Sequence, residues 1–295
     1  MNTFNQNLII VGSGLVGMTM ALKLSKQKIQ STILEKNSLQ ILNKISDKRT
    51  SAISQGSSRI LKEIGIWEKI KKFAQPINEI IVTEGLDENG INFNSKIMNE
   101  GPLGYIVENS ILKKTVLNEL KKSNFIKLID NTKIKKISYQ DDFITISSNK
   151  GNFKSSLLIG ADGRFSDIRR HANLKYFFKD YNQFALVFNI KHKNPHNEIA
   201  LERFFPSGPL AILPMKSSKM RYSSVVWTID KSEKDKVLKN KDFKSLFNER
   251  YNNFFGEIEN FTKPKIYSLN IFSCHEYFKK NIVLIGDACQ AIHPI

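Results

Sequence analysis

Near its N-terminus the chain reads Leu8-Ile9-Ile10-Val11-Gly12-Ser13-Gly14-Leu15-Val16-Gly17. The first four residues form a short apolar run that ends in glycine, a pattern typical of a strand buried in a parallel sheet. Helical character follows over residues 15–26, and Ser31-Thr32-Ile33-Leu34 predicts a second strand. The stretch therefore predicts a strand–helix–strand unit with a right-handed crossover.

The glycines of this stretch are spaced as in a loop that binds a dinucleotide. Gly12 permits a tight turn, Gly14 lets the backbone approach a pyrophosphate, and Gly17 lets the helix pack closely on the strand. The helix N-terminus offers unpaired N–H groups to the phosphate. Glu35, at the end of the second strand, can bind a ribose hydroxyl and favours FAD or NAD over NADP. A purely structural turn and a solvated strand-end acid are the alternatives.

Composition narrows the class of protein. The chain has 295 residues, of which 41% are hydrophobic and 25% charged, so it has enough apolar material for a packed core. No run approaches the roughly 18 apolar residues that a membrane span requires. The sequence begins without a secretory pattern, and Cys274 and Cys289 form neither a disulfide framework nor a zinc motif. We therefore expect a cytoplasmic protein without a metal site.

The net charge of +17 needs its own explanation. The excess is mostly lysine scattered along the chain, and no arginine-rich stripe alternates with aromatic residues as single-strand binding requires. We expect a solvated, lysine-rich surface and no nucleic-acid partner. Weak attraction to anionic lipid, about 1 kcal/mol per well-placed lysine, is the alternative use of this charge.

Two later segments repeat the buried-strand pattern. Leu157-Leu158-Ile159 runs into Gly160, and Ile282-Val283-Leu284-Ile285 runs into Gly286. Short alternating runs around them predict antiparallel strands, including a meander over residues 133–159. The predicted fold class is α/β, with a Rossmann-like nucleotide-binding domain interleaved with a mostly antiparallel β-sheet domain. The nucleotide-binding domain is assigned residues 1–74, 105–175 and 277–295, and the sheet domain residues 75–104 and 176–276.

Each of these two strands leads into a further motif. The first enters Asp162-Gly163-Arg164-Phe165-Ser166-Asp167-Ile168-Arg169, in which Asp-Gly by itself usually marks a turn. The second enters Gly286-Asp287-Ala288, with His293-Pro294 close behind. Asp287 stands where open α/β sheets bind ligands, and a helix N-cap is the alternative role for its side chain.

The order and spacing of these motifs resemble the single-component FAD-dependent aromatic hydroxylases, the p-hydroxybenzoate hydroxylase-like superfamily. The resemblance rests on Gly12-x-Gly14-x-x-Gly17, Asp162-Gly163-x-x-Ser166-x-x-Arg169, and Gly286-Asp287-Ala288 with His293-Pro294. A further stretch is similar to the ubiquinone-biosynthesis branch: Glu202-Arg203-Phe204-Phe205-Pro206-x-Gly208-Pro209-Leu210-Ala211-Ile212-Leu213-Pro214. The resemblance covers essentially the whole chain. It implies a glutathione-reductase-like topology for the FAD-binding domain and a substrate-binding role for the sheet domain.

The resemblance also assigns cofactor-binding residues in the first half of the chain. It places Gly12, Gly14, Gly17 and Glu35 on the ADP half of FAD. Arg49, in Asp47-x-Arg49, matches a family arginine near the flavin, and a surface arginine is the alternative reading.

The later motifs receive their roles in the same way. Asp162 and Gly163 would lie near the pyrophosphate and the approach of the nicotinamide. Gly286 and Asp287 would bind the ribityl or pyrophosphate region. His293-Pro294 would begin the loop under the isoalloxazine, and Pro294 would contact the cofactor there.

The chemistry that the resemblance implies belongs to the flavin. NADH or NADPH reduces FAD, the reduced flavin captures dioxygen as a C4a-hydroperoxide, and this species hydroxylates an electron-rich phenolic ring. No catalytic acid or base residue is therefore expected. The substrate would be a lipophilic phenol, namely a polyprenylated phenol or benzoquinone precursor of ubiquinone. Since such a molecule lives in the bilayer, the resemblance also implies peripheral contact with the inner face of the membrane and with a ubiquinone-biosynthesis complex.

Two other functions remain open at this point. A flavin-dependent isoprenoid reductase would share the nucleotide motifs. In the family, His-Pro is followed by a glycine-rich flavin loop, a helix and a further segment, whereas this chain stops at Ile295. We therefore expect a C-terminally truncated chain that lacks the helical part of the family. An inactive remnant or assembly partner is the second alternative.

Overall fold

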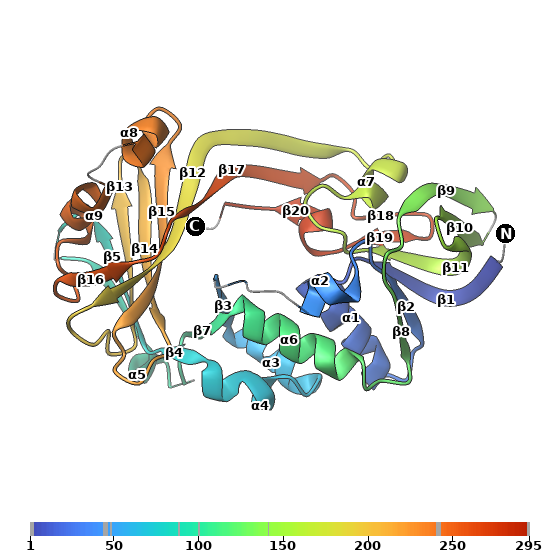
Figure 1. Ribbon diagram of the computed structural model, residues 1–295, viewed down its shortest axis with the longest axis horizontal. Helices are drawn as coiled ribbons and strands as arrows, with labels where there is room; N and C mark the ends of the chain where they lie inside the picture. The colour runs from blue at the N-terminus through green and yellow to red at the C-terminus, as the bar shows by residue number, and fades with distance from the viewer. Residues whose placement is uncertain are drawn as a thin grey trace.

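The computed structural model describes residues 3–43, 47, 49–87, 89–99, 101–140, 142–239 and 243–293. Figure 1 shows two sheet-containing parts, one near the N-terminus and one around β13–β15. The long strands β12 (Tyr176–His192) and β17 (Lys265–Cys274) pair antiparallel and run from one part to the other.

The first sheet holds the three strands that the sequence predicts as buried. In the described chain it has eight strands, with the order β18-β19-β11-β1-β2-β8 and with β10 and β9 continuing from β11. Its strands are β1 (Thr3–Val11), β2 (Ser31–Leu34), β8 (Ile126–Ile129), β9 (Ile134–Gln140), β10 (Phe143–Ser148), β11 (Gly151–Gly160), β18 (Phe278–Lys279) and β19 (Ile282–Leu284). β1 pairs in parallel with β2 and β11, and β11 pairs in parallel with β19. The three strands therefore end side by side at one edge of the sheet.

The predicted antiparallel meander is confirmed in the same sheet. β9 pairs antiparallel with β10, and β10 pairs antiparallel with β11. β11 is therefore antiparallel to one neighbour and parallel to the other. This arrangement joins the meander to the nucleotide-type strands without a linker.

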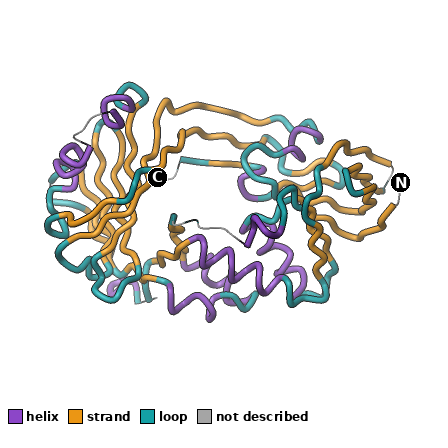
Figure 2. Tube along the Cα trace, viewed as in Figure 1, coloured by secondary structure: helices purple, strands orange, loops and turns teal. Residues whose placement is uncertain are grey.

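Helices gather along one side of the first sheet (Figure 2). They are α1 (Leu15–Lys26), α3 (Gln55–Glu63), α4 (Trp67–Ile70) and α6 (Asn109–Leu120). Met18 of α1 and Val116 of α6 share a buried apolar cluster with Ile10 and Ile33 of the sheet. The buried residues of α6 are Leu112, Val116, Leu117 and Leu120, and they form the face by which this helix packs.

The second sheet has nine strands in the described chain, with the order β20-β17-β12-β15-β14-β13-β5-β6 and with β16 on β12. Besides β12 and β17 it contains β5 (Glu79–Glu84), β6 (Ile91–Asn94), β13 (Ile199–Phe205), β14 (Gly208–Met215), β15 (Tyr222–Asp230), β16 (Ile258–Phe261) and β20 (Gln290–Ala291). Most of its pairs are antiparallel, as predicted. α8 (Lys234–Lys239) and α9 (Phe243–Tyr251) cover one face, where Phe247 packs on Phe188 and Trp227.

A small sheet lies between these two parts. It consists of β3 (Thr50–Ser54), β7 (Gly104–Glu108) and β4 (Gln75–Ile77), with β7 in the middle. The remaining short helices are α2 (Leu39–Asn43), η1 (Lys71–Phe73), α5 (Ser95–Met98), α7 (Asp167–His171) and η2 (Gly286–Ala288). The proposed domain boundaries stay a prediction.

The described residues include no helix with the length and apolar character needed to cross a membrane.

Candidate functional site

The glycine loop after β1 has the close contacts that its spacing predicts. Gly12 has φ +103°, and a Cβ there would lie 2.4 Å from the Ala161 carbonyl oxygen. A Cβ on Gly17 would lie 2.1 Å from the Gly12 carbonyl oxygen. A Cβ on Gly14 would meet nothing within 4 Å. Packing therefore requires glycine at the first and third positions, while the second keeps its side of the loop open.

The N-terminus of α1 is suited to an anion. Gly14 is its N-cap residue, and no side chain caps the first turn. The first N–H groups of a helix have no partner within the helix, and the helix dipole gives them partial positive charge. A diphosphate is the group that such a glycine-lined helix end binds. These residues therefore fit the pyrophosphate of FAD.

Glu35 ties the end of β2 to this loop. Its Oε2 accepts hydrogen bonds from the Ser13 backbone N–H at 2.8 Å and from the Ser13 hydroxyl at 2.7 Å. Its Oε1 accepts from the Asn37 backbone N–H at 2.8 Å and from the Asn37 amide at 2.9 Å. The residue is only 5% exposed. The reading of Glu35 as a solvated acid is therefore wrong, and its proposed contact with ribose stays a prediction.

An open pocket of about 550 Å³ lies at the shared edge of β1, β2 and β11. Five of the predicted residues line it: Gly12, Gly14, Glu35, Asp162 and Gly163. Gly17, Arg49, Gly286 and Asp287 are not among its lining residues. The pocket thus brings together residues from three separate parts of the sequence.

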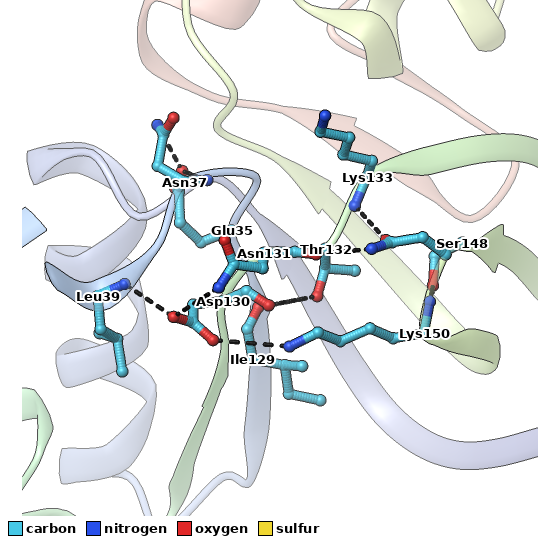
Figure 3. Close-up of polar contacts among 11 residues, drawn as sticks. Glu35, Asn37, Leu39, Ile129, Asp130, Asn131, Thr132, Lys133, Ser148 and Lys150 are labelled. Carbon is cyan, nitrogen blue, oxygen red and sulfur yellow. Dashed lines mark hydrogen bonds and ion pairs between the residues drawn. The ribbon is translucent and has the colours of Figure 1, made fainter. Parts of the chain in front are cut away.

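The outer wall of this pocket is a loop that the sequence analysis missed. Thr132, Lys133 and Ile134, between β8 and β9, line the pocket. Figure 3 shows this loop facing Glu35 and Asn37. The Thr132 N–H donates to the Glu35 carbonyl oxygen at 2.8 Å, so the two loops are held together. The signal that could have found it is Asp130, an acid directly after the parallel strand β8 as Glu35 is directly after β2, and its Oδ2 accepts from the Leu39 N–H at 2.7 Å.

Asp162 has a structural role in addition to its place in the pocket. Its Oδ1 accepts from the Ser166 hydroxyl at 2.5 Å, and its Oδ2 accepts from the N–H groups of Asp167 at 2.7 Å and Ile168 at 3.1 Å. The carboxylate therefore closes the turn that begins α7. Gly163 has φ +83° and an open surrounding, which fits the predicted turn.

Arg169 connects the second motif to the third. The side chain is 8% exposed, and it donates from Nη1 to the Ala288 carbonyl oxygen and from Nη2 to the Arg164 carbonyl oxygen, both at 2.8 Å. Its guanidinium carbon lies 4.8 Å from the ring centroid of Tyr176 and 4.6 Å from that of Phe272. These hydrogen bonds therefore hold η2 against the loop between β11 and α7, which lines the pocket.

The third motif also contacts the first. Gly286 has φ +60°, and a Cβ there would lie 2.9 Å from a methyl group of Val16 in α1. Asp287 is exposed and lies within η2, whose N-cap residue is Ile285, so the alternative reading of Asp287 as an N-cap is wrong. The cofactor contact of Asp287 stays a prediction, and Pro294 lies outside the described residues.

Arg49 is held by a local ion pair beside the second sheet. Its Nε donates to Asp47 Oδ1 at 2.8 Å and its Nη2 to Asp47 Oδ2 at 2.7 Å. These bonds hold the pKa of Asp47 well below its usual range. The guanidinium carbon lies 5.3 Å from the ring centroid of Tyr267 on β17. Arg49, which directly precedes β3, therefore lies against β17 of the second sheet, and its approach to the flavin stays a prediction.

Comparison with solved structures identifies the class of fold. The crystal structure of pqsL, a probable FAD-dependent monooxygenase from Pseudomonas aeruginosa, superposes with a TM-score of 0.81 at 17% identity and covers 98% of this chain and 80% of that one. The predicted fold class is confirmed: this is the fold of the FAD-dependent monooxygenases.

Residues 5–295 match the family described as FAD binding domain, and the chain belongs to that family. The ubiquinone hydroxylase UbiL of Rhodospirillum rubrum is 29% identical over 98% of this chain and 67% of its own length. The ubiquinone hydroxylase UbiM of Neisseria meningitidis is 24% identical over 99% of this chain and 65% of its own length. The chain thus spans about two thirds of these relatives. The family resemblance and the cofactor FAD are confirmed.

Proposed function

We propose that this protein is an FAD-dependent monooxygenase that uses NADH or NADPH and dioxygen to hydroxylate a polyprenylated phenol or benzoquinone precursor of ubiquinone. The observation that carries the proposal is the convergence of Gly12, Glu35 and Asp162 on one pocket, in a chain similar to ubiquinone hydroxylases over nearly all of its residues. A reductase of isoprenoid chains shares only the nucleotide motifs, and the relatives do not favour it.

The chain's own residues have two tasks in this reaction. FAD, when bound, supplies the hydride acceptor and the activation of dioxygen. The glycine loop and the N-terminus of α1 would hold its pyrophosphate, while Glu35 fixes the loop beside the ribose position through Ser13. The face of the second sheet toward Arg49 would hold the phenolic ring and exclude water, because water diverts activated oxygen into hydrogen peroxide.

The experiment that tests this function is turnover by the purified, FAD-loaded protein. We expect oxidation of NADH or NADPH that requires dioxygen and yields a product with one added oxygen atom. Reduced double bonds formed without dioxygen would instead identify a reductase. Flavin-loaded protein that turns over no phenol would leave only a role in assembly, and protein that gains no flavin would contradict the proposal entirely.

The proposal extends to the location of the reaction. A polyprenylated substrate partitions into the bilayer, and a net charge of +17 attracts anionic lipid headgroups. We therefore propose peripheral contact with the inner face of the membrane, where other enzymes of ubiquinone biosynthesis would meet the same substrate pool. The protein should sediment with anionic vesicles at low salt and be released as salt increases, and sedimentation equal to that with neutral vesicles would contradict this part.

A further inference from the structure

Side chains along β13 alternate between the two faces of the second sheet. Leu201 belongs to the apolar cluster that includes Phe247 of α9, and Arg203 donates from Nη1 to the Arg250 carbonyl oxygen of the same helix at 2.7 Å. These two residues therefore face the helices. Glu202, which lies between them, faces the opposite way.

The face that carries Glu202 looks toward the nucleotide-binding part of the molecule. Ala200, two residues earlier on the same face, packs against Ile77 and Ile106 of the small sheet. Glu202 therefore lies on the surface that the proposed function assigns to the substrate.

The strand pairs show which residues share the face of Glu202 across the second sheet, as far as the position of Arg49. Glu202 on β13 pairs with Ala211 on β14. Ala211 pairs in turn with Val226 on β15, and Val226 pairs with Val187 on β12. Val187 is opposite Lys265 on β17, and Tyr267 lies two residues farther on the same face. Glu202 is therefore on the same face of the second sheet as Tyr267, the ring over which Arg49 lies.

The immediate neighbours of Glu202 are apolar. Val82 on β5 and Ala211 on β14 lie directly opposite it. Ile91, opposite Val82, is 63% exposed, and Phe204 on the same face is 45% exposed. Val82, Ile91 and Phe204 also line an open pocket of about 530 Å³. The exposed Glu84 lines this pocket as well, whereas Glu202 lies beside it. A largely apolar surface with a few polar groups is the usual composition of a site for an apolar ligand.

Within the described residues, one oxygen of the Glu202 carboxyl is left without a partner. Glu202 Oε1 is buried and has no hydrogen-bond partner in the part of the chain that the structure describes. Desolvation raises the pKa of Glu202 to about 7. Buried polar groups are nearly always hydrogen-bonded, and an exception in a cleft is typical of a functional group.

Few charged or titratable groups share this face with Glu202. On β5, Glu84 lies opposite Phe204 and is exposed. On β17 the groups are Lys265 and Tyr267, with three strands between β17 and β13. Lys191 on β12 and Tyr222 and Asp230 on β15 share the face as well, toward the ends of those strands. The neighbouring side chains on β14 and β15 are uncharged, as the pairs with Ala211 show.

We propose that the Glu202 carboxylate accepts a hydrogen bond from the ring hydroxyl of the phenolic substrate and so positions the ring on this face of the sheet. The inference rests on the proposed function. It gives the unpartnered oxygen a donor that arrives only with the substrate. The exposed side chains of Ile91 and Phe204 then provide apolar surface for the chain that the ring carries.

The test measures binding rather than turnover. FAD-loaded protein without NADH or NADPH is titrated with ortho-prenylphenol, and binding is followed by the change in flavin absorption and fluorescence. For the wild type we expect affinity to rise as the pH passes upward through about 7, because the carboxylate is the better acceptor. Glu202→Gln should bind about tenfold more weakly above that pH and should lose the rise.

Two further variants make the result specific to Glu202. Glu249→Gln, at an exposed position on α9 over the opposite face of the sheet, is the control and should follow the wild type. Glu202→Asp keeps the ionisable group and should keep a pH-dependent affinity at a reduced level. Equal FAD affinity in all variants shows that the fold is intact.

The outcomes also separate this inference from the proposed function. If Glu202→Gln binds the probe with wild-type affinity and pH profile, or if the flavin-loaded wild type does not bind it, the positioning role is refuted while oxygen-dependent hydroxylation can stand. Wild-type protein that gains no flavin refutes the proposed function and this inference together.

Discussion

Glu35 accepts two hydrogen bonds from Ser13, one from the backbone N–H at 2.8 Å and one from the hydroxyl at 2.7 Å. A carboxylate at the end of β2 thus fixes the conformation of the loop at the end of β1. The two strands are parallel neighbours, so the contact closes the gap between their ends. The loop is therefore shaped before a phosphate arrives, which reduces the ordering cost of binding.

This contact predicts the effect of Glu35→Ala on cofactor binding. We expect FAD affinity, measured by recovery of flavin fluorescence on dilution, to fall about tenfold or more, because the buried Ser13 N–H loses its acceptor. The free energy of unfolding should fall by about 2 kcal/mol. Glu68→Ala, at an exposed position on α4, is the control, and equal FAD affinity in the two variants would contradict the role of Glu35.

Two glycines allow a matched test of backbone packing. Gly17→Ala should destabilise the protein by about 2 kcal/mol or more, because the new Cβ would lie 2.1 Å from the Gly12 carbonyl oxygen. Gly56→Ala, in α3, meets only the Ser54 hydroxyl at 3.9 Å and should stabilise by about 0.5 kcal/mol. Urea unfolding measures both changes, and a shift of the same sign in the two variants would count against this packing.

Two neighbouring arginines of α7 should contribute very different amounts to the free energy of unfolding. Arg169→Leu removes both bonds to the carbonyl oxygens of Ala288 and Arg164 and should reduce the free energy of unfolding by about 3 kcal/mol. Arg170→Leu removes an exposed ion pair with Asp167 and should change it by less than about 0.5 kcal/mol. Equal losses in thermal unfolding would show that Arg169 does not hold η2 in place.

The lowered pKa of the buried His192 predicts how the free energy of unfolding depends on pH. The side chain is fully buried with both ring nitrogens hydrogen-bonded, and desolvation lowers its pKa from 6.5 to about 4. Below pH 6.5 the unfolded chain takes up a proton that the folded chain refuses, so stability falls as the pH drops from 6.5 toward 4. The loss from this residue should reach up to about 3 kcal/mol.

Denaturant unfolding at a series of pH values measures this loss. The buried His196 also has a lowered pKa and acts in the same direction. His171→Asn, at an exposed position, should leave the pH dependence of the free energy of unfolding unchanged, whereas His192→Asn should reduce it. An identical pH dependence in the wild type and in His192→Asn would contradict the role of His192 in this loss of stability.

The parts of the site that the sequence predicts are those with a local physical signature. Gly12 and Gly17 are required by contacts within the loop and α1, so their spacing alone indicates the turn. The three buried strands end in glycine and pair in parallel, which makes their common edge predictable as well. Leu112, Val116 and Leu120 of α6 are four residues apart, so this helix also has a local signature.

The parts that the sequence does not predict depend on contacts between distant segments. Thr132 and Lys133 reach the pocket because β8 pairs with β2, and the only local mark of their stretch is the strand-end acid Asp130. Cys274 and Cys289 have an uninformative spacing, yet the Cys274 N–H donates to the Cys289 carbonyl oxygen at 2.9 Å. The face on which Glu202 lies is also not predictable from its own stretch, because it is known only from the contact of its neighbour Arg203 with α9.

β12 begins beside Arg169, through Tyr176, and ends at the buried His192 at the far side of the second sheet. Its pairing with β17 is regular except for a shift between Asp180 and Gln183, where the ladder is interrupted. A ribbon of two strands resists stretching but bends where its ladder is broken. We therefore expect the ribbon to bend between Asp180 and Gln183 when one half of the molecule moves against the other.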